Sequence, residues 1–145
     1  MALSGTWRAI PGYEGWYEVS DHGWVRSVPR TYVTVDGRPI TYRCRIIRSR
    51  LVHAYMVVNL NVRGKQTTRP VHQLVAEAFI GPRPHGMVVC HCDDNPANNQ
   101  PSNLRYDTRR ANSADAVKHG RLYGRKRGLL PNEIRAASTG CLAGR

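Results

Sequence analysis

The chain has 145 residues, enough for one ordinary domain or two very small ones that share a surface. It carries 22 Lys and Arg against 10 Asp and Glu, and this net charge of +12 favours nucleic acid as the partner over a membrane surface. With no run of 18 apolar residues and no signal-peptide core at the N-terminus, we expect a soluble, cytoplasmic protein.

Residues 1–70 have the pattern of antiparallel β-structure. Aromatic and β-branched runs in residues 7–30 are broken by glycines, and their three tryptophans fit a core better than a stacking platform for bases. Asp36-Gly37 lies between two alternating runs, which predicts a hairpin with a two-residue type I′ turn. A further strand pair, YMVVNLNV and QTTRPV, is joined by Arg63-Gly64-Lys65.

Basic residues dominate this β-region. Between Gly23 and Pro70 there are ten basic side chains against one acid, Asp36. In the segment RCRIIRSR the arginines bracket Ile46 and Ile47, so the isoleucines can enter a core while the arginines point away. A merely solvated face is the alternative, but the one-sided charge favours phosphate contacts. The residues predicted to bind DNA are Arg43, Arg45, Arg48, Arg50, Arg105, Arg109, Arg110, Arg125, Lys126 and Arg127.

The second half begins with apolar residues at helical spacing, which predict a helix over residues 71–79. His72 on this helix is expected to pack or face solvent rather than bind a ligand. After a proline-stiffened connector, MVVCH and LRY read as short strands around a polar loop, and Asp107 or Thr108 can cap a helix that ends before Gly120. A basic tail, residues 121–145, follows, with a short helix predicted at 131–138.

The polar loop gathers residues suited to phosphodiester chemistry. His91 ends the first strand and is the candidate general base, because a neutral imidazole can take a proton from water. Asn112, in the first turns of the helix, is expected to face back toward His91. Its oxygen and that of Asp93 suit a hard divalent cation. Asn103 is expected to pin the loop backbone so that the imidazole stays oriented.

These residues carry a family resemblance. The segment HCDDNPANNQPSNLRYDTRRAN resembles the HNH endonuclease motif, in the phage and homing variant whose last position is Asn. The resemblance implies a ββα-metal fold, with His91 as general base, Asn103 as the ordering asparagine and Asn112 as a metal ligand. Upstream, WRAIPGYEGWYEVSDHGWVRS is similar to a nuclease-associated modular domain, and VHQLVAEAFIG to the helix that precedes the metal loop. The resemblance covers about residues 7–119.

Cys90 departs from the family pattern. Similar proteins have Asp or Asn just before the histidine, where it can supply the second metal ligand, and a thiol suits Mg²⁺ poorly. Three alternatives stay open: Asp93 or water replaces Cys90, the site prefers a softer ion such as Mn²⁺, or activity is weakened. A zinc cluster of Cys90, His91 and Cys92 is disfavoured because consecutive strand side chains point to opposite faces. The four cysteines are expected to be free thiols.

The sequence thus predicts an α+β protein with a β-rich, DNA-binding region over residues 1–70, a helix plus ββα nuclease motif over 71–120, and a flexible basic tail over 121–145. We expect a metal-dependent endonuclease that hydrolyses double-stranded DNA with one Mg²⁺ or Mn²⁺, leaving 3′-hydroxyl and 5′-phosphate ends, and that takes no small-molecule substrate. The alternatives are a DNA-binding protein with a degenerate nuclease site and a structural zinc module. By resemblance, the host compartment is the bacterial cytoplasm.

Overall fold

The computed structural model describes residues 4–118 and Gly120. Their order of elements confirms the predicted α+β class with antiparallel strands. The elements are β1 (Trp7–Ala9), β2 (Tyr17–Ser20), β3 (Val25–Ser27), β4 (Arg30–Val33), β5 (Pro39–Tyr42), β6 (Ile46–Ile47), β7 (Arg50–Val52), β8 (Tyr55–Val62), β9 (Lys65–Pro70), α1 (Val71–Phe79), β10 (Met87–His91), the 3-10 helix η1 (Pro101–Asn103), β11 (Leu104–Thr108) and α2 (Arg109–Lys118).

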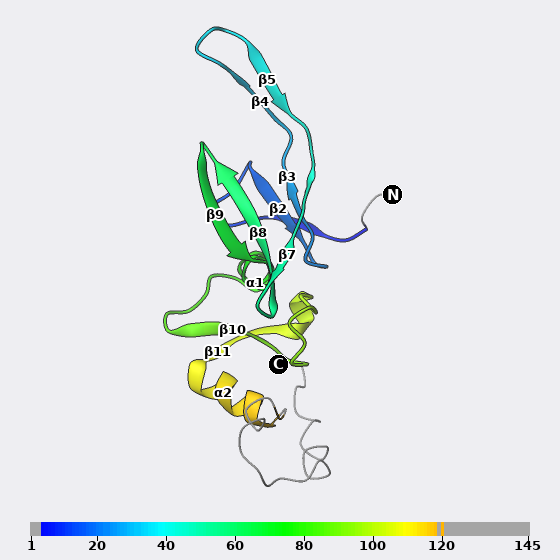
Figure 1. The fold of residues 1–145 in the computed structure, drawn as a ribbon, viewed down its shortest axis with the longest axis vertical. Coiled ribbons are helices and arrows are strands. Elements are labelled where there is room, and N and C mark those ends of the chain that lie inside the picture. Colours follow the sequence, from blue (N-terminus) through cyan, green and yellow to red (C-terminus); the bar gives the residue numbers. More distant parts are fainter. Residues whose placement is uncertain (1–3, 119, 121–145) are drawn as a thin grey trace.

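The strands form four small sheets, and every pairing between neighbouring strands is antiparallel. One sheet has the order β1-β2-β3-β6 and another the order β7-β8-β9, while β4-β5 and β10-β11 are two-stranded. The β4-β5 hairpin projects at one end of the molecule, and the β10-β11 hairpin lies with α2 toward the other end (Figure 1). Helix α1 lies between the N-terminal sheets and the β10-β11 hairpin.

The hairpin turns correct one detail of the prediction. At Asp36-Gly37 the strands do form a hairpin, but Thr34 pairs with Arg38, so the loop has three residues and only Gly37 has a positive φ, +77°. The type I′ turn occurs instead between β8 and β9. There Val62 pairs with Lys65, and both loop residues, Arg63 and Gly64, have positive φ.

Helix α1 covers residues 71–79 as its apolar spacing predicted, and it holds the core together. Val71, Leu74 and Val75 are fully buried against strands of the first 70 residues. Leu104 of β11 belongs to the same cluster. The β10-β11 hairpin and the N-terminal sheets therefore share one hydrophobic core, with α1 as the common element.

Two apolar residues expected inside are exposed. Ile46 is 44% exposed, because a two-residue edge strand can turn only one of two consecutive side chains inward, and that one is Ile47. Trp24 is 45% exposed, contrary to the expectation that the tryptophans are core residues. Trp7 and Trp16 are half-buried beneath the guanidinium groups of Arg26 and Arg30, each 4.1 Å from the ring centroid.

Neither α-helix within the described residues has the length and apolar character needed to span a bilayer. The predicted basic tail, with Arg125, Lys126 and Arg127, and the helix expected at residues 131–138 lie outside the described residues.

Candidate active site

The candidate site is built on the β10-β11 hairpin and α2. The register pairs Cys90 with Arg105 and His91 with Leu104, so the side chains of Cys90 and His91 point to opposite faces. The strand β11 runs directly into α2, and Thr108 Oγ1 accepts a hydrogen bond of 3.2 Å from the backbone N–H of Ala111. Thr108 is therefore the N-cap, one of the two caps that the sequence predicted.

Asn103 organises the loop between the two strands. Its Oδ1 accepts a hydrogen bond from the backbone N–H of Asp93 at 3.0 Å, and its Nδ2 donates to Asp93 Oδ1 at 2.8 Å and to the Asn98 carbonyl at 2.9 Å. Asn103 is itself buried. These bonds confirm that the Asn103 amide pins the loop backbone, while its importance for catalysis stays a prediction.

Asp93, a predicted metal ligand, is occupied within the same loop. Besides Asn103, its carboxylate accepts bonds from the Asn95 backbone at 2.9 Å and from Asn98 Nδ2 at 2.7 Å. Burial pushes the pKa of Asp93 upward, but the hydrogen bonds from Asn98, Asn95 and Asn103 outweigh it and hold the pKa below its ordinary value. Asp93 is therefore an ionised loop anchor whose oxygens already have partners.

His91, the candidate base, is held by a side chain that the sequence did not single out. Its Nε2 lies 3.1 Å from Oδ1 of Asn99, which is buried. Two rings form a wall beside it: the ring centroid of His72 lies 5.2 Å away in an edge-to-face arrangement, and that of Tyr55 lies 6.2 Å away. The imidazole thus has a fixed neighbourhood although it is only half-buried itself.

His72 packs, as expected, but it also contacts the candidate base. Burial of the imidazole, followed by the proximity of His91, lowers the pKa of His72 to about 4. Its Nδ1 is buried without a hydrogen-bond partner among the described residues. At neutral pH His72 is therefore an uncharged ring, and it adds no positive charge beside His91.

Cys90 is unsuited to bind a metal in this structure. The residue is 2% exposed, and its Sγ lies 3.9 Å from the carbonyl oxygen of Val88. Burial raises the pKa of its thiol to about 11, with Arg105 opposing that change and Asp107 adding to it. At 2% exposure the residue leaves little of its sulfur accessible to an ion. The geometry therefore opposes the predicted role of Cys90 as a ligand.

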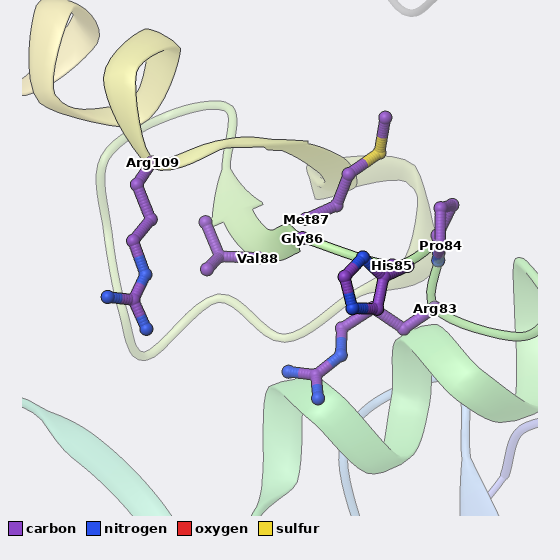
Figure 2. A pocket seen from close by; sticks show the side chains of 7 residues that line it. All are labelled: Arg83, Pro84, His85, Gly86, Met87, Val88 and Arg109. Atoms are coloured by element: carbon purple, nitrogen blue, oxygen red, sulfur yellow. The ribbon is translucent and has the colours of Figure 1, made fainter.

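Asn112, the predicted metal ligand on α2, is exposed and lines a cavity of about 410 Å³. His72 and Arg109 line the same cavity, so Asn112 and the ring beside His91 face a common space. An adjoining cavity of about 540 Å³ is lined by Arg83, Pro84, His85, Gly86, Met87, Val88 and Arg109 (Figure 2). Figure 2 shows the guanidinium groups of Arg83 and Arg109 directed to the same side of β10.

The predicted DNA-binding arginines fall into two groups. Arg105 is half-buried and pairs with Asp107 at 3.3 Å and with Asp115 of α2, so its guanidinium attaches the helix to the hairpin. Arg105 thus has structural partners within the hairpin-helix unit, and its contact with DNA phosphates stays a prediction. The other predicted arginines within the described residues are exposed and thus accessible to a polyanion: Arg43, Arg45, Arg48, Arg50, Arg109 and Arg110.

The described residues offer only part of a metal site. They contain no group of three or more His, Cys, Asp or Glu side chains placed to hold an ion, and the described cysteines are free thiols: Cys44, Cys90 and Cys92. Of the predicted ligands, Asn112 and Asp93 are exposed, but the oxygens of Asp93 already accept hydrogen bonds within the loop. Mg²⁺ commonly keeps several waters and takes phosphate oxygens, so few protein ligands are compatible with it.

Sequence reasoning missed two contacts of His91, those with Asn99 and His72. Asn99 lies among several asparagines of one loop, and nothing in its spacing separates it from Asn95 or Asn98. His72 lies 19 positions before His91, and a single histidine on an apolar helix gives no signal of its partner. Both roles depend on tertiary contacts, which periodicity does not encode.

Comparison with known families assigns both halves of the chain. Residues 69–114 match the family described as HNH endonuclease, and residues 6–61 match the NUMOD4 motif. The resemblance predicted from the sequence is therefore confirmed, and the chain carries an HNH endonuclease region behind a NUMOD4 motif. HNH nucleases generally use a divalent metal.

Individual relatives come from phages and prophages. The DNA endonuclease I-HmuI of Bacillus phage SP01 is 34% identical over 116 residues, which are 80% of this chain and 60% of that protein. The SPbeta prophage-derived protein YosQ of Bacillus subtilis (strain 168) is 33% identical over 96 residues, 64% of this chain and 56% of that protein. The chain therefore spans about three fifths of the length of these relatives.

The fold is also that of a solved structure. The HNH homing endonuclease I-HmuI, determined in a study of its DNA binding and cleavage, matches with a TM-score of 0.59 and 30% identity. The match covers 91% of this chain and 66% of that one. The likeness thus includes both the N-terminal sheets and the hairpin-helix unit.

Proposed function

We propose that this protein is a DNA endonuclease that hydrolyses phosphodiester bonds with His91 as general base. The observation that carries the proposal is the placement of His91, at the end of β10 and held at Nε2 by Asn99. It lies next to a ring that lines an arginine-bearing cavity. The HNH assignment of residues 69–114 supports this reading. The relative I-HmuI is named as a DNA endonuclease.

The chain's own groups suffice for several parts of the reaction. His91 takes a proton from water, whose oxygen bonds to phosphorus as the bond from phosphorus to the 3′ oxygen breaks. The departing 3′ oxygen takes a proton from solvent water, so the products are a 3′-hydroxyl and a 5′-phosphate. Asn103 keeps the loop in place, and the ring of His72 beside His91 is uncharged at neutral pH. The restricted motion of the imidazole lowers the entropic cost of reaching the transition state.

A divalent cation, Mg²⁺ or Mn²⁺, would stabilise negative charge on the phosphate and the departing oxygen. We propose Asn112 as its protein ligand, because its amide oxygen is accessible in the cavity shared with His72. The buried, protonated thiol of Cys90 is excluded from our proposed ligand set.

Double-stranded DNA is the proposed substrate, and the exposed arginines its electrostatic contacts. Arg109 lines both cavities of the hairpin-helix unit, so it is the best candidate for a phosphate next to the cut. Replacing Arg109 by Ala should weaken binding to all sequences alike and reduce the slope of log K against log [salt] by about 1. Fluorescence anisotropy at several salt concentrations measures both; an unchanged slope would place this side chain away from DNA.

The principal test is His91→Ala, measured by nicking of supercoiled plasmid in Mg²⁺ and in Mn²⁺. We expect the rate to fall on the order of 100-fold or more while DNA retention in a gel shift stays within a factor of three. His22→Ala is the matched control, because His22 is exposed on the β2-β3 turn and has no part in the proposed chemistry. Equal rates for wild type and His91→Ala would contradict the role of His91.

A second function is supported by Cys90. Where similar proteins have a carboxylate or amide, this chain has a buried, protonated thiol, which favours a DNA-binding protein whose nuclease site has degenerated. Wild-type protein that binds DNA but shows no metal-dependent nicking with either ion would establish this alternative. We further propose that the region of residues 1–70 serves DNA binding in both cases, and that the protein acts in the bacterial cytoplasm.

A further inference from the structure

The hydrogen bond between His91 and Asn99 determines which ring nitrogen is the base. Oδ1 of an amide can only accept, so the nitrogen facing it, Nε2, must carry the hydrogen. A neutral imidazole has one N–H, and therefore Nδ1 retains the lone pair that can accept a proton from water. Asn99 is 6% exposed, so solvent does not compete readily for this bond.

Asn99 is supported in turn by the N-terminal sheet. Gly23, in the turn between β2 and β3, approaches Asn99 so closely that a Cβ atom added at Gly23 would lie 3.2 Å from the Cβ of Asn99. The same Cβ would lie 3.2 Å from Cγ1 of Val71 in α1. The φ of Gly23 is +80°, a conformation that side chains with a Cβ rarely adopt. Glycine thus allows the turn to approach the loop this closely.

The turn itself is well anchored. Ser20 is fully buried, and its Oγ accepts hydrogen bonds from the backbone N–H groups of His22 at 3.3 Å and Trp24 at 3.0 Å. The N–H of Gly23 donates to the Ser20 carbonyl at 3.0 Å. The β2-β3 turn is therefore held in place by hydrogen bonds where it packs against Asn99, the side chain that contacts the imidazole of His91.

We propose that Asn99 is the positioning residue of His91 and that it holds the ring so that Nδ1 is the proton-accepting nitrogen. In the same proposal, the β2-β3 turn keeps Asn99 in place because Gly23 packs against it. Besides its proposed contact with DNA, the N-terminal sheet then also helps to position the general base, because its β2-β3 turn packs against Asn99. This inference rests on the proposed endonuclease function only for its kinetic consequence, since the tautomer of His91 is a property of the protein alone.

The tautomer is measurable directly by ¹⁵N NMR of the imidazoles in the uniformly labelled full chain, at a pH where the His91 ring is neutral. The resonances of His91 are assigned by their loss in His91→Ala. We expect wild type to have the hydrogen on Nε2, Asn99→Asp to keep it there because an acceptor oxygen remains, and Asn99→Leu to lose this preference. A wild-type ring with its hydrogen on Nδ1, or a Leu variant with the wild-type signature, would overturn the proposal.

Cleavage provides the second readout. Under single-turnover conditions on supercoiled plasmid, Asn99→Leu should reduce the rate on the order of 100-fold with DNA affinity within a factor of three, and Asn99→Asp should recover most of the rate. A change in affinity with an unchanged rate would contradict a positioning role. If wild type shows no cleavage, the endonuclease proposal fails while the NMR result still decides whether Asn99 sets the tautomer.

The support from the N-terminal sheet is tested with a matched glycine pair. Gly23 and Gly15 have similar backbone conformations, with φ of +80° and +74°, but a Cβ on Gly15 would meet nothing within 4 Å. Both Ala variants carry backbone strain, and Gly23→Ala adds the close contacts with Asn99 and Val71, so its melting temperature should fall at least as far as that of Gly15→Ala. Only Gly23→Ala should also slow cleavage and disturb the His91 resonances. Equal effects of the two variants on His91 would refute the support through Gly23.

Discussion

Acid should destabilise this protein through His72, and the size of the effect follows from its burial. The ring packs against those of Tyr55 and His91, and burial lowers its pKa to about 4 in the folded protein from an ordinary value of 6.5. Between pH 4 and pH 6.5, His72 is mostly protonated in the unfolded chain and mostly neutral in the folded protein. Stability from this group is therefore complete above pH 6.5 and is lost as the pH falls toward 4.

The expected loss is substantial. One unit of pKa difference corresponds to about 1.4 kcal/mol, so the lowered pKa of His72 amounts to roughly 3 kcal/mol in total, of which between about 2 and 3 kcal/mol is lost by pH 4.5. Typical domains have only about 5 to 15 kcal/mol of stability, so urea unfolding followed by tryptophan fluorescence can resolve the change.

His72→Phe separates this effect from the titration of carboxylates. Phenylalanine keeps a planar ring against Tyr55 and cannot bind a proton, so the difference in unfolding free energy between wild type and variant should change with pH by the amount given above. Parallel curves for the two proteins from pH 7.5 to 4.5 would refute the reasoning, because they would mean that burial of His72 does not oppose its protonation.

Two further predictions concern the hairpin and its helix. Cys90 should react with iodoacetamide at neutral pH at least about tenfold more slowly than the exposed Cys44, because its thiol is buried and its pKa is about 11. Peptide mass spectrometry measures the labelling of both cysteines, and equal labelling would contradict the burial of Cys90. Thr108→Ala should lower the free energy of unfolding by about 1 kcal/mol because the N-cap bond to Ala111 is lost, whereas Thr108→Ser should retain most of it in urea unfolding. A Ser variant as unstable as the Ala variant would show that the cap hydroxyl is not the stabilising group.

Features that depend on neighbours in the sequence were predictable. The apolar spacing of residues 71–79 gave the bounds of α1, because one stripe of such a helix must be buried. Thr108 was identifiable as a cap because a hydroxyl just before a helix can accept a backbone hydrogen bond. The loop-pinning amide of Asn103 follows the same logic, since short polar side chains bond to nearby backbone.

Features that depend on distant partners were not predictable. Asp36-Gly37 has the composition of a two-residue turn, yet the pairing of Thr34 with Arg38 makes the loop one residue longer. Ile46 and Trp24 have apolar side chains whose exposure depends on which strand and helix cover them. The hydrogen bond from His91 to Asn99 joins the end of β10 to the loop that follows it, but the turn that contacts Asn99 comes from a different sheet.

The single hydrophobic cluster has a consequence for how such proteins can recombine. Val71 and Leu74 pack with residues of the N-terminal sheets, and Leu104 of β11 belongs to the same cluster. Removal of either half would therefore expose apolar side chains of the other half to water. A chain cut near residue 69 would present that face to water and tend to aggregate. Exchange of either half with that of a related protein would therefore need apolar residues that fit the same face of α1.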